Sequence, residues 1–175
     1  MSDRRRQFEA LALPHLDAAY NLARWLSRSP TDAEDIVQEA MLRAFDAFDQ
    51  LRGDNIRPWL MRIVRNCCHA HFGHRYRRRH VPLPVGAATP ELVYDGPDAE
   101  ALAVRASDGR RLRATMATLP DEFREVLILR EMEDFSYREI AEVIGAPIGT
   151  VMSRLSRARA LLRDKWMAEE SHGLR

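Results

Sequence analysis

One face of the last helical stretch carries small and polar side chains beside arginines, a pattern that suits recognition of duplex DNA. Small residues let a helix sink into the major groove, where the guanidinium of Arg157 can reach base edges. Arg154 and Arg159 flank this face, where the phosphates of a duplex would lie. At helical spacing, the face consists of Gly149, Met152, Ser153, Ser156 and Arg157.

Two helices position this face, and capping residues predict where they begin and end. Ser136 followed by Glu139 is a capping box, and Gly145 suits the left-handed residue at which a short helix ends. Just past Pro147, the second helix runs from about Ile148 to Trp166. Its apolar stripe, expected to be buried, is Ile148, Val151, Leu155, Ala158 and Leu162. This layout predicts a helix-turn-helix; the alternative is a structural hairpin with a solvated basic face.

The amino-terminal half carries two further stretches that could bind partners. From Asp32 to Asp49, six acids stand against one arginine on an amphipathic helix that exposes Gln38. Such a helix could bind a protein, although an acidic helix is also commonly just a solvated face. From Asn55 to His80 there are seven arginines and no acid, close to aromatic side chains. Charge and stacking of this kind suit single-stranded or melted nucleic acid.

Charge is unevenly distributed, although the net charge of the chain is only +1. Residues 81–104 carry four acids and no base, whereas residues 150–165 are again basic. This balance gives no global basic field, but two basic stripes suit a protein that touches a polyanion at two places.

Helical periodicity covers most of the chain. The first helix is predicted from about Pro14 to Ser27, and the second from a capping box at Thr31 and Glu34 to about Phe48. A third begins at Pro58 and ends in the arginine run. In the second half, helices are predicted over about residues 98–119 and 121–132, ahead of the helix-turn-helix.

Residues 81–97 interrupt this pattern with four prolines and two glycines, a density of breakers that no regular element tolerates. We therefore predict an all-α fold of two small helical domains, residues 1–80 and residues 98–175, joined by a flexible linker. We see no spare apolar stripe for an interface between the domains, so their binding faces are expected to stay open.

Other chemistries find little support in the sequence. No phosphate-binding loop, zinc-protease or nucleophile-elbow pattern occurs, so we expect no enzyme. Adjacent Cys67 and Cys68 disfavour a disulfide, and we expect both to pack in the core. With His71 and His74 they could bind metal, but we expect neither metal nor cofactor. With no signal peptide and no apolar run of about 20 residues, we expect a cytoplasmic protein that does not enter the membrane.

Both halves resemble the extracytoplasmic-function sigma factors, the smallest class of the sigma-70 family. The stretch DAEDIVQEAMLRAF, from Asp32 to Phe45, resembles their region 2.2, and LRGDNIRPWLMRIVRN, from Leu51 to Asn66, resembles regions 2.3 and 2.4. The stretch from Leu119 to Arg163 resembles region 4 nearly throughout. Because response regulators share a helix-turn-helix, the first half is what distinguishes this family.

The resemblance implies a transcription initiation factor that acts with RNA polymerase core and has no catalytic site of its own. Its acidic helix would bind the clamp helices of the β′ subunit, and the β flap would be a further contact. The residues implied at the clamp helices are Asp35, Gln38, Glu39 and Arg43.

The resemblance also implies two contacts with promoter DNA. Residues that would capture the opened −10 element are Arg52, Gly53, Asp54, Asn55, Arg62, Arg65 and Asn66. Residues that would read the −35 element are Thr150, Met152, Ser153, Arg154, Ser156, Arg157 and Arg159. Many relatives carry arginine or lysine where this chain has Met152.

The family implies a separate anti-sigma factor, which we expect to cover the faces near Gln38 and Arg157 together. Two other functions remain open at this point. One is a stand-alone helix-turn-helix transcription regulator, and the other is a purely protein-binding helical module.

Overall fold

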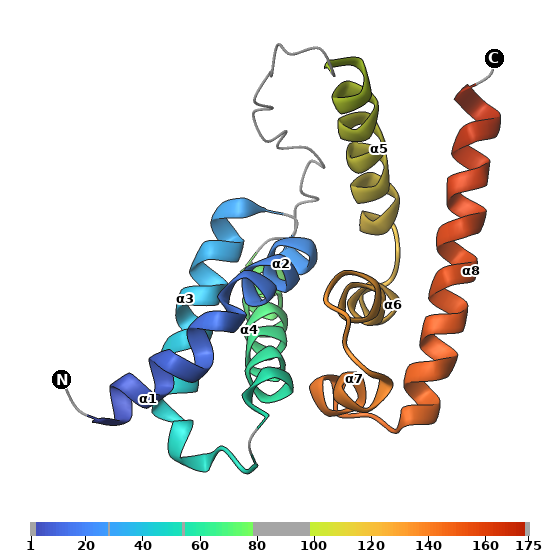
Figure 1. Ribbon diagram of the computed structural model, residues 1–175. Coiled ribbons are helices and arrows are strands. Elements are labelled where there is room, and N and C mark those ends of the chain that lie inside the picture. The colour runs from blue at the N-terminus through green and yellow to red at the C-terminus, as the bar shows by residue number, and fades with distance from the viewer. Residues whose placement is uncertain (1–2, 28, 54, 79–98, 174–175) are drawn as a thin grey trace.

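The computed structural model describes residues 3–27, 29–53, 55–78 and 99–173, in which every regular element is a helix. The side chains described are those of residues 3–27, 29–53, 55–71 and 108–168. The helices form two halves that lie side by side (Figure 1). The predicted all-α fold with two helical domains is therefore confirmed, whereas the predicted linker lies outside the described residues.

The amino-terminal half is a bundle of three helices that pack against one another, with a fourth helix packed against the bundle through fewer contacts. Its elements are α1 (Asp3–Ala12), η1 (Leu13–His15), α2 (Leu16–Ser27), α3 (Pro30–Asp46), η2 (Phe48–Gln50) and α4 (Ile56–Arg78). Leu22, Leu60 and Val64 are fully buried between α2, α3 and α4. The ring of Phe8 meets Phe45 and Phe48 edge to face, with ring centroids 5.3 Å apart in each pair, and fixes α1 on the bundle.

Two predicted helix starts in this half need correction. Ser29, and not Thr31, caps α3: its side chain accepts a hydrogen bond from the backbone N–H of Asp32 at 3.3 Å. Pro30 fits the first turn because its missing N–H would be unpaired there in any case. Pro14 likewise does not open a long helix but lies in the short 3-10 turn between α1 and α2.

The carboxyl-terminal half packs three further helical elements and a helix-turn-helix around a second core. Its elements are α5 (Ala99–Ala117), α6 (Asp121–Leu127), a π-helical turn η3 (Ile128–Met132), α7 (Tyr137–Ile144) and α8 (Ile148–Gly173). Phe135, Ile140 and Leu155 are almost fully buried where α6, α7 and α8 meet.

The predicted turn of the helix-turn-helix is confirmed at both ends of α7. Ser136 and Glu139 form the capping box, and Gly145 ends the helix with φ 66° and ψ 40°. A residue with a Cβ is strained in that left-handed conformation, so glycine suits the turn. In α8, Val151, Leu155 and Ala158 of the predicted stripe are buried.

The ends of that stripe differ from the prediction. Ile148 is 45% exposed because it opens the helix, before α8 reaches its neighbours. Leu162 is only half-buried and lines an open groove with Leu112.

The expectation that the two halves lack an interface is wrong for the described residues. Helix α7 packs along α4, and α6 and η3 lie against α2 (Figure 1). Polar side chains bridge the halves, among them Asn21, which donates a hydrogen bond to Glu133 at 3.2 Å. An apolar stripe in the sequence does not reveal an interface that is bridged by polar side chains.

Candidate nucleic-acid and polymerase interfaces

The face of α8 predicted to read duplex DNA is open to solvent. Met152 is 53% exposed, and Ser153, Ser156 and Arg157 are exposed with it. Thr150 is half-buried at the start of the helix, where its backbone N–H bonds to the carbonyl of Pro147. Helix α7 and the Gly145 turn present the first half of α8, which is the part of a recognition helix that reaches base edges.

The three arginines of α8 that are predicted to contact DNA fall into two groups. Arg154 is half-buried and lies 3.2 Å from Glu122, and Arg159 lies 2.6 Å from Glu131. Arg157 has no hydrogen-bond or ion-pair partner among the described residues. Of the three predicted DNA-contacting arginines, it is the one that reaches a ligand without first breaking an ion pair.

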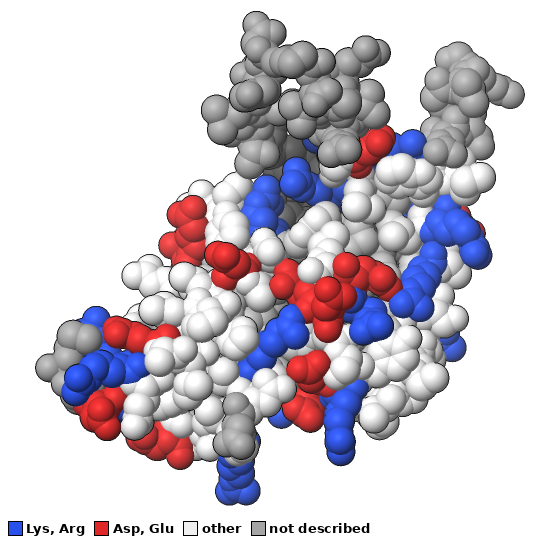
Figure 2. Space-filling model, viewed as in Figure 1, with Lys and Arg blue, Asp and Glu red and all other residues white. Residues whose placement is uncertain are grey.

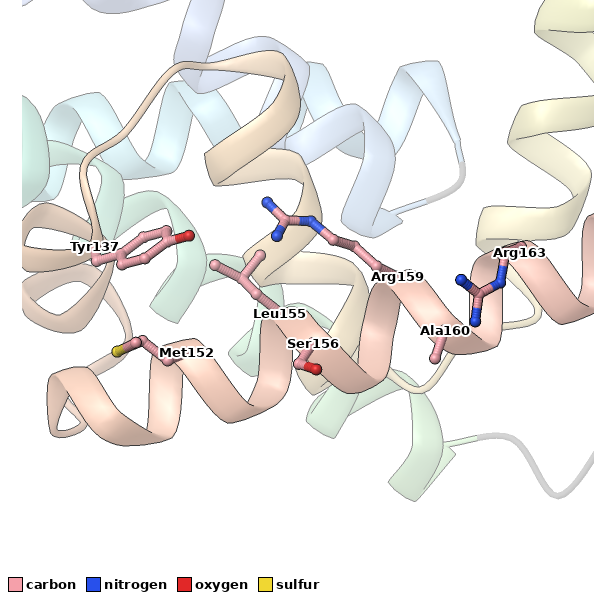
Figure 3. Close-up of a pocket in the computed structure, with 7 residues that line it drawn as sticks. All are labelled: Tyr137, Met152, Leu155, Ser156, Arg159, Ala160 and Arg163. Carbon is pink, nitrogen blue, oxygen red and sulfur yellow. The ribbon is translucent and has the colours of Figure 1, made fainter.

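A shallow recess lies between the two helices of the helix-turn-helix (Figure 3). Tyr137 of α7 lies across it from Met152, and Arg159 of α8 extends over it. Sequence reasoning missed Tyr137 as a site residue, because a tyrosine in the first turn of a short helix gives no signal of its own.

The acidic helix α3 presents a polar face with one large apolar residue on it. Asp35, Gln38 and Glu39 are exposed, and Glu39 pairs with Arg43 at 2.6 Å. Leu42, which sequence reasoning did not single out, is 59% exposed on the same face. An apolar centre within a polar rim is typical of a protein-binding surface.

The residues predicted to hold the −10 element do not all share one open surface. Arg52 and Gly53 are exposed after η2, with Gly53 at φ 87°, and Asn66 is exposed on α4. Asp54 lies outside the described residues. Asn55 is exposed but donates a hydrogen bond to Glu139, and Arg62 is exposed with its guanidinium near Gly145. Arg65 is half-buried and donates to Glu125 of the carboxyl-terminal half.

Glu125 of α6 is the centre of this contact. Its side chain is 2% exposed and accepts two hydrogen bonds from Arg65, at 2.7 and 3.2 Å. His69 lies 3.5 Å away and Arg154 lies 3.6 Å away. Burial alone would raise the pKa of this carboxyl, but hydrogen bonds from His69 and Arg65 outweigh it, and the pKa is lowered.

Two family models match this chain, one in each half. Residues 11–79 match the family model for sigma-70 region 2, and residues 109–162 match the model for sigma-70 region 4. RNA polymerase sigma-H factor of Pseudomonas aeruginosa is 32% identical over 163 residues, covering 89% of this chain and 83% of the relative. The chain belongs to the extracytoplasmic-function sigma factors of the sigma-70 family.

Two further proteins place this sigma factor among its relatives. It is 34% identical to ECF RNA polymerase sigma factor SigE of Mycolicibacterium smegmatis over 94% of its own length, but it spans only 63% of that protein. The sigma factor RpoE of Bartonella quintana, solved in complex with the anti-sigma factor NepR, matches with a TM-score of 0.75 and 28% identity. That match covers 93% of this chain and 98% of the other.

The cysteines of this sigma factor are core residues, as predicted. Cys67 is 4% exposed and Cys68 1% exposed, and burial raises the pKa of the Cys68 thiol to about 12. No three His, Cys, Asp or Glu side chains gather into a metal site among the described residues; the side chain of His74 is outside them. Within the same ranges, no helix has the length and apolar character needed to span a membrane.

Charge on the face shown in Figure 2 is mixed and not segregated by sign. Acidic and basic side chains lie intermingled across its middle. The basic stretches read from the sequence are thus partly neutralised in the folded sigma factor by acids such as Glu122, Glu125 and Glu131.

Proposed function

We propose that this sigma factor directs RNA polymerase to promoters, with its carboxyl-terminal half reading the −35 element as duplex DNA. The observation that carries the proposal is the exposed face of α8 in a helix-turn-helix whose capping box and glycine turn are both formed. Arg157 would donate to a base edge in the major groove, and the exposed Met152 would make an apolar contact. Thr150, Ser153 and Ser156 complete the face, with Arg154 and Arg159 beside the phosphates.

The amino-terminal half is assigned to the −10 element. The loop that contains Arg52, Gly53, Asp54 and Asn55 would capture a base flipped out of the stack. The α4 residues Arg62, Arg65 and Asn66 would hold the opened strand. Support comes from the match of residues 11–79 to region 2, together with the exposure of Arg52, Gly53 and Asn66.

Two surfaces suit contact with RNA polymerase. The face of α3 around Leu42, with Asp35, Gln38, Glu39 and Arg43, is assigned to the β′ clamp helices. An apolar groove between α5, α6 and α8, lined by Leu112, Leu127, Leu162 and Trp166, suits the β flap. Catalysis would belong to the polymerase, so this chain needs no active site, metal or cofactor.

The remaining assignments follow from these contacts. A protein that meets polymerase and the chromosome acts in the cytoplasm. An anti-sigma factor is its natural inhibitor, a role supported by the relative from Bartonella quintana, which was solved with such a partner. We assign residues 1–80 to region 2, residues 81–97 to the linker and residues 98–175 to region 4. A stand-alone regulator is disfavoured, since region 2 occupies the first half of the chain.

Charge reversal on α3 tests the polymerase assignment. The double variant Asp35→Arg with Glu39→Arg should fold normally, because both side chains are exposed, yet fail to co-purify with core polymerase. Loss of one charge from a buried interface pair costs about 2–5 kcal/mol, which is enough to dissociate the complex.

A matched control makes the same change in charge elsewhere in region 2. Asp3→Arg with Glu9→Arg alters two acids of α1, neither of which lies on the proposed face. This control should co-purify as the wild type does. Normal co-purification of the α3 variant would remove the clamp-helix assignment.

A further inference from the structure

Met152 is a large apolar side chain within the exposed face of α8 that is proposed to read duplex DNA. It is more than half exposed, and Ile148, one turn earlier on the same side of the helix, is exposed as well. The other exposed side chains of the face, Ser153, Ser156 and Arg157, are polar. The first turns of α8 therefore present an apolar edge beside a polar face.

Met152 and Arg157 lie at opposite edges of that face. Their separation along the sequence corresponds to about 140° of rotation around an α-helix. Met152 lies on the side that faces Tyr137 of α7, across the shallow recess of Figure 3. The Tyr137 ring packs against the core, and the guanidinium of Arg130 lies 5.3 Å from its centroid, so the ring forms a fixed wall of the recess. Met152 and Arg157 would thus meet different base pairs.

The chemistry of methionine limits what Met152 can recognise. A thioether has no hydrogen to donate and is only a weak acceptor, so Met152 cannot make the paired donor contact that selects the O6 and N7 atoms of guanine. The apolar group that the major groove offers is the 5-methyl of thymine. An A·T pair with its methyl group toward Met152 is therefore the base pair that this side chain fits.

The polar side chains nearest to Met152 along α8 do not supply the missing donors. The hydroxyl of Ser153 donates to the backbone carbonyl one turn earlier at 3.0 Å, so its proton points back into the helix. Arg159, about two turns beyond Met152 on the same side, donates to Glu131 from two nitrogens, at 3.0 and 2.6 Å. Ser156 can donate or accept, and a single hydroxyl does not choose between bases. Selectivity at this edge of the face thus rests on Met152.

We propose that Met152 makes the −35 specificity of this sigma factor depend on the 5-methyl group of one thymine, while Arg157 reads a separate base pair at the other edge of the face. Contact with the methyl group removes apolar surface of both partners from water. This inference rests on the proposed −35 role of α8, and it names the base that one residue of α8 selects. A chain with a hydrogen-bond donor in place of Met152 would prefer guanine at the same position.

Uracil substitution tests the methyl contact on the unaltered chain. Holoenzyme, formed from core polymerase and the full chain, first selects its preferred sequences from a pool of DNA duplexes randomised across the promoter region. Each thymine of the selected −35 sequence is then replaced by deoxyuridine, which pairs with adenine as thymine does but lacks the methyl group. We expect the Kd to rise about fourfold at one of these positions, as the loss of one methyl contact predicts.

Substitution of Met152 shows whether this residue reads the methyl group. Met152→Ala should bind the thymine and deoxyuridine duplexes with equal affinity, because no side chain then reaches the methyl group. Met167→Ala is the matched control, since Met167 lies on the same helix and is similarly exposed, at 57% against 53%. It lies about 22 Å further along the helix axis, so this control should keep the wild-type difference between the duplexes. Both side chains are exposed, so neither change should disturb the fold.

Met152→Arg adds a readout in which a new preference appears. A guanidinium can donate to O6 and N7 of guanine together, so selection with this variant should replace A·T by G·C at the uracil-sensitive position, with guanine preferred about tenfold. The preference at the base pair read by Arg157 should not change.

The proposal is overturned if no deoxyuridine weakens binding of the wild type, or if Met152→Ala still distinguishes thymine from deoxyuridine. A change of base preference in Met152→Arg at a position other than the uracil-sensitive one would also overturn it. A holoenzyme that selects a −10 sequence but no −35 sequence would refute the proposed −35 role of α8 itself, and the Met152 contact with it.

Discussion

Arg157 differs from Arg154 and Arg159 of α8 in that it pairs with no acid among the described residues. Arg154 and Arg159 are paired with glutamates of α6 and η3, so DNA would have to compete for them. A phosphate that displaces one of these glutamates adds to affinity only the difference between the two interactions. We therefore expect base discrimination to rest on Arg157 more than on the flanking arginines.

Paired alanine substitutions separate the two proposed DNA contacts. Arg157→Ala should weaken binding to −35 duplex by about 1–3 kcal/mol and relax base preference, with little effect on capture of a −10 strand. Asn66→Ala should do the reverse. Fluorescence anisotropy with the two DNA forms, measured on holoenzyme, checks this. Equal loss of both activities in both variants would contradict the division of labour.

The buried thiols give a prediction about reactivity. The thiolate is the nucleophile, and burial holds Cys68 in its protonated form, with a pKa of about 12, while it also raises the pKa of Cys67. In the native protein at pH 8, both should react with a thiol reagent far more slowly than free cysteine. In guanidinium chloride both should react at once. Rapid reaction of the native protein would show that α4 does not bury these residues.

The helix-turn-helix depends on a backbone conformation that only glycine adopts freely. Gly145→Ala should lower the free energy of unfolding by about 1–2 kcal/mol, because the left-handed conformation brings a Cβ against the backbone. Among the described residues, Arg62 alone lies within 4 Å of the new atom, so crowding contributes little. Urea denaturation followed by circular dichroism measures the change.

Gly109 provides the control for that experiment. Gly109 lies inside α5, and no described atom lies within 4 Å of a Cβ added there. Gly109→Ala should therefore raise the free energy of unfolding by about 0.5–1 kcal/mol. Effects of the same sign at the two positions would show that the turn is not what constrains Gly145.

Local signals in the sequence predicted the carboxyl-terminal helices best. Ser136, Glu139 and Gly145 mark the ends of α7 by hydrogen bonds within a few residues, so a pattern of neighbours is sufficient. The start of α3 was misassigned because Ser29 and Thr31 both fit the capping pattern. In the structure Ser29 directly precedes Pro30 of the first turn, and its side chain accepts the capping hydrogen bond from Asp32.

The candidate site was predictable where it consists of one helix face and not where two halves meet. Spacing alone placed Met152, Ser153, Ser156 and Arg157 together on α8. No pattern of neighbours could show that Arg65 reaches Glu125, 60 positions away, since that contact depends on how the halves pack. Leu42 was overlooked because an isolated exposed leucine is indistinguishable in sequence from a core residue.

The arrangement of the whole molecule makes its stability sensitive to acid. The pKa of Glu125 is lowered in the folded state, so the unfolded chain binds the proton first as the pH falls. The contribution of its ion pairs is complete above the ordinary value of 4.5 and is lost progressively below it. The urea midpoint of the wild type should therefore fall more steeply below pH 4.5 than that of Glu125→Gln. Parallel curves for the two proteins would contradict the role given to this carboxylate.

The central claim, that this chain selects promoters for RNA polymerase, is tested most directly by transcription from genomic DNA with purified components. Core polymerase with and without the purified chain is supplied with nucleotides, and the 5′ ends of the transcripts are sequenced. We expect a set of start sites that appears only with the chain and that shares paired −35 and −10 sequences at constant spacing. Identical start sites with and without the chain would contradict the assignment.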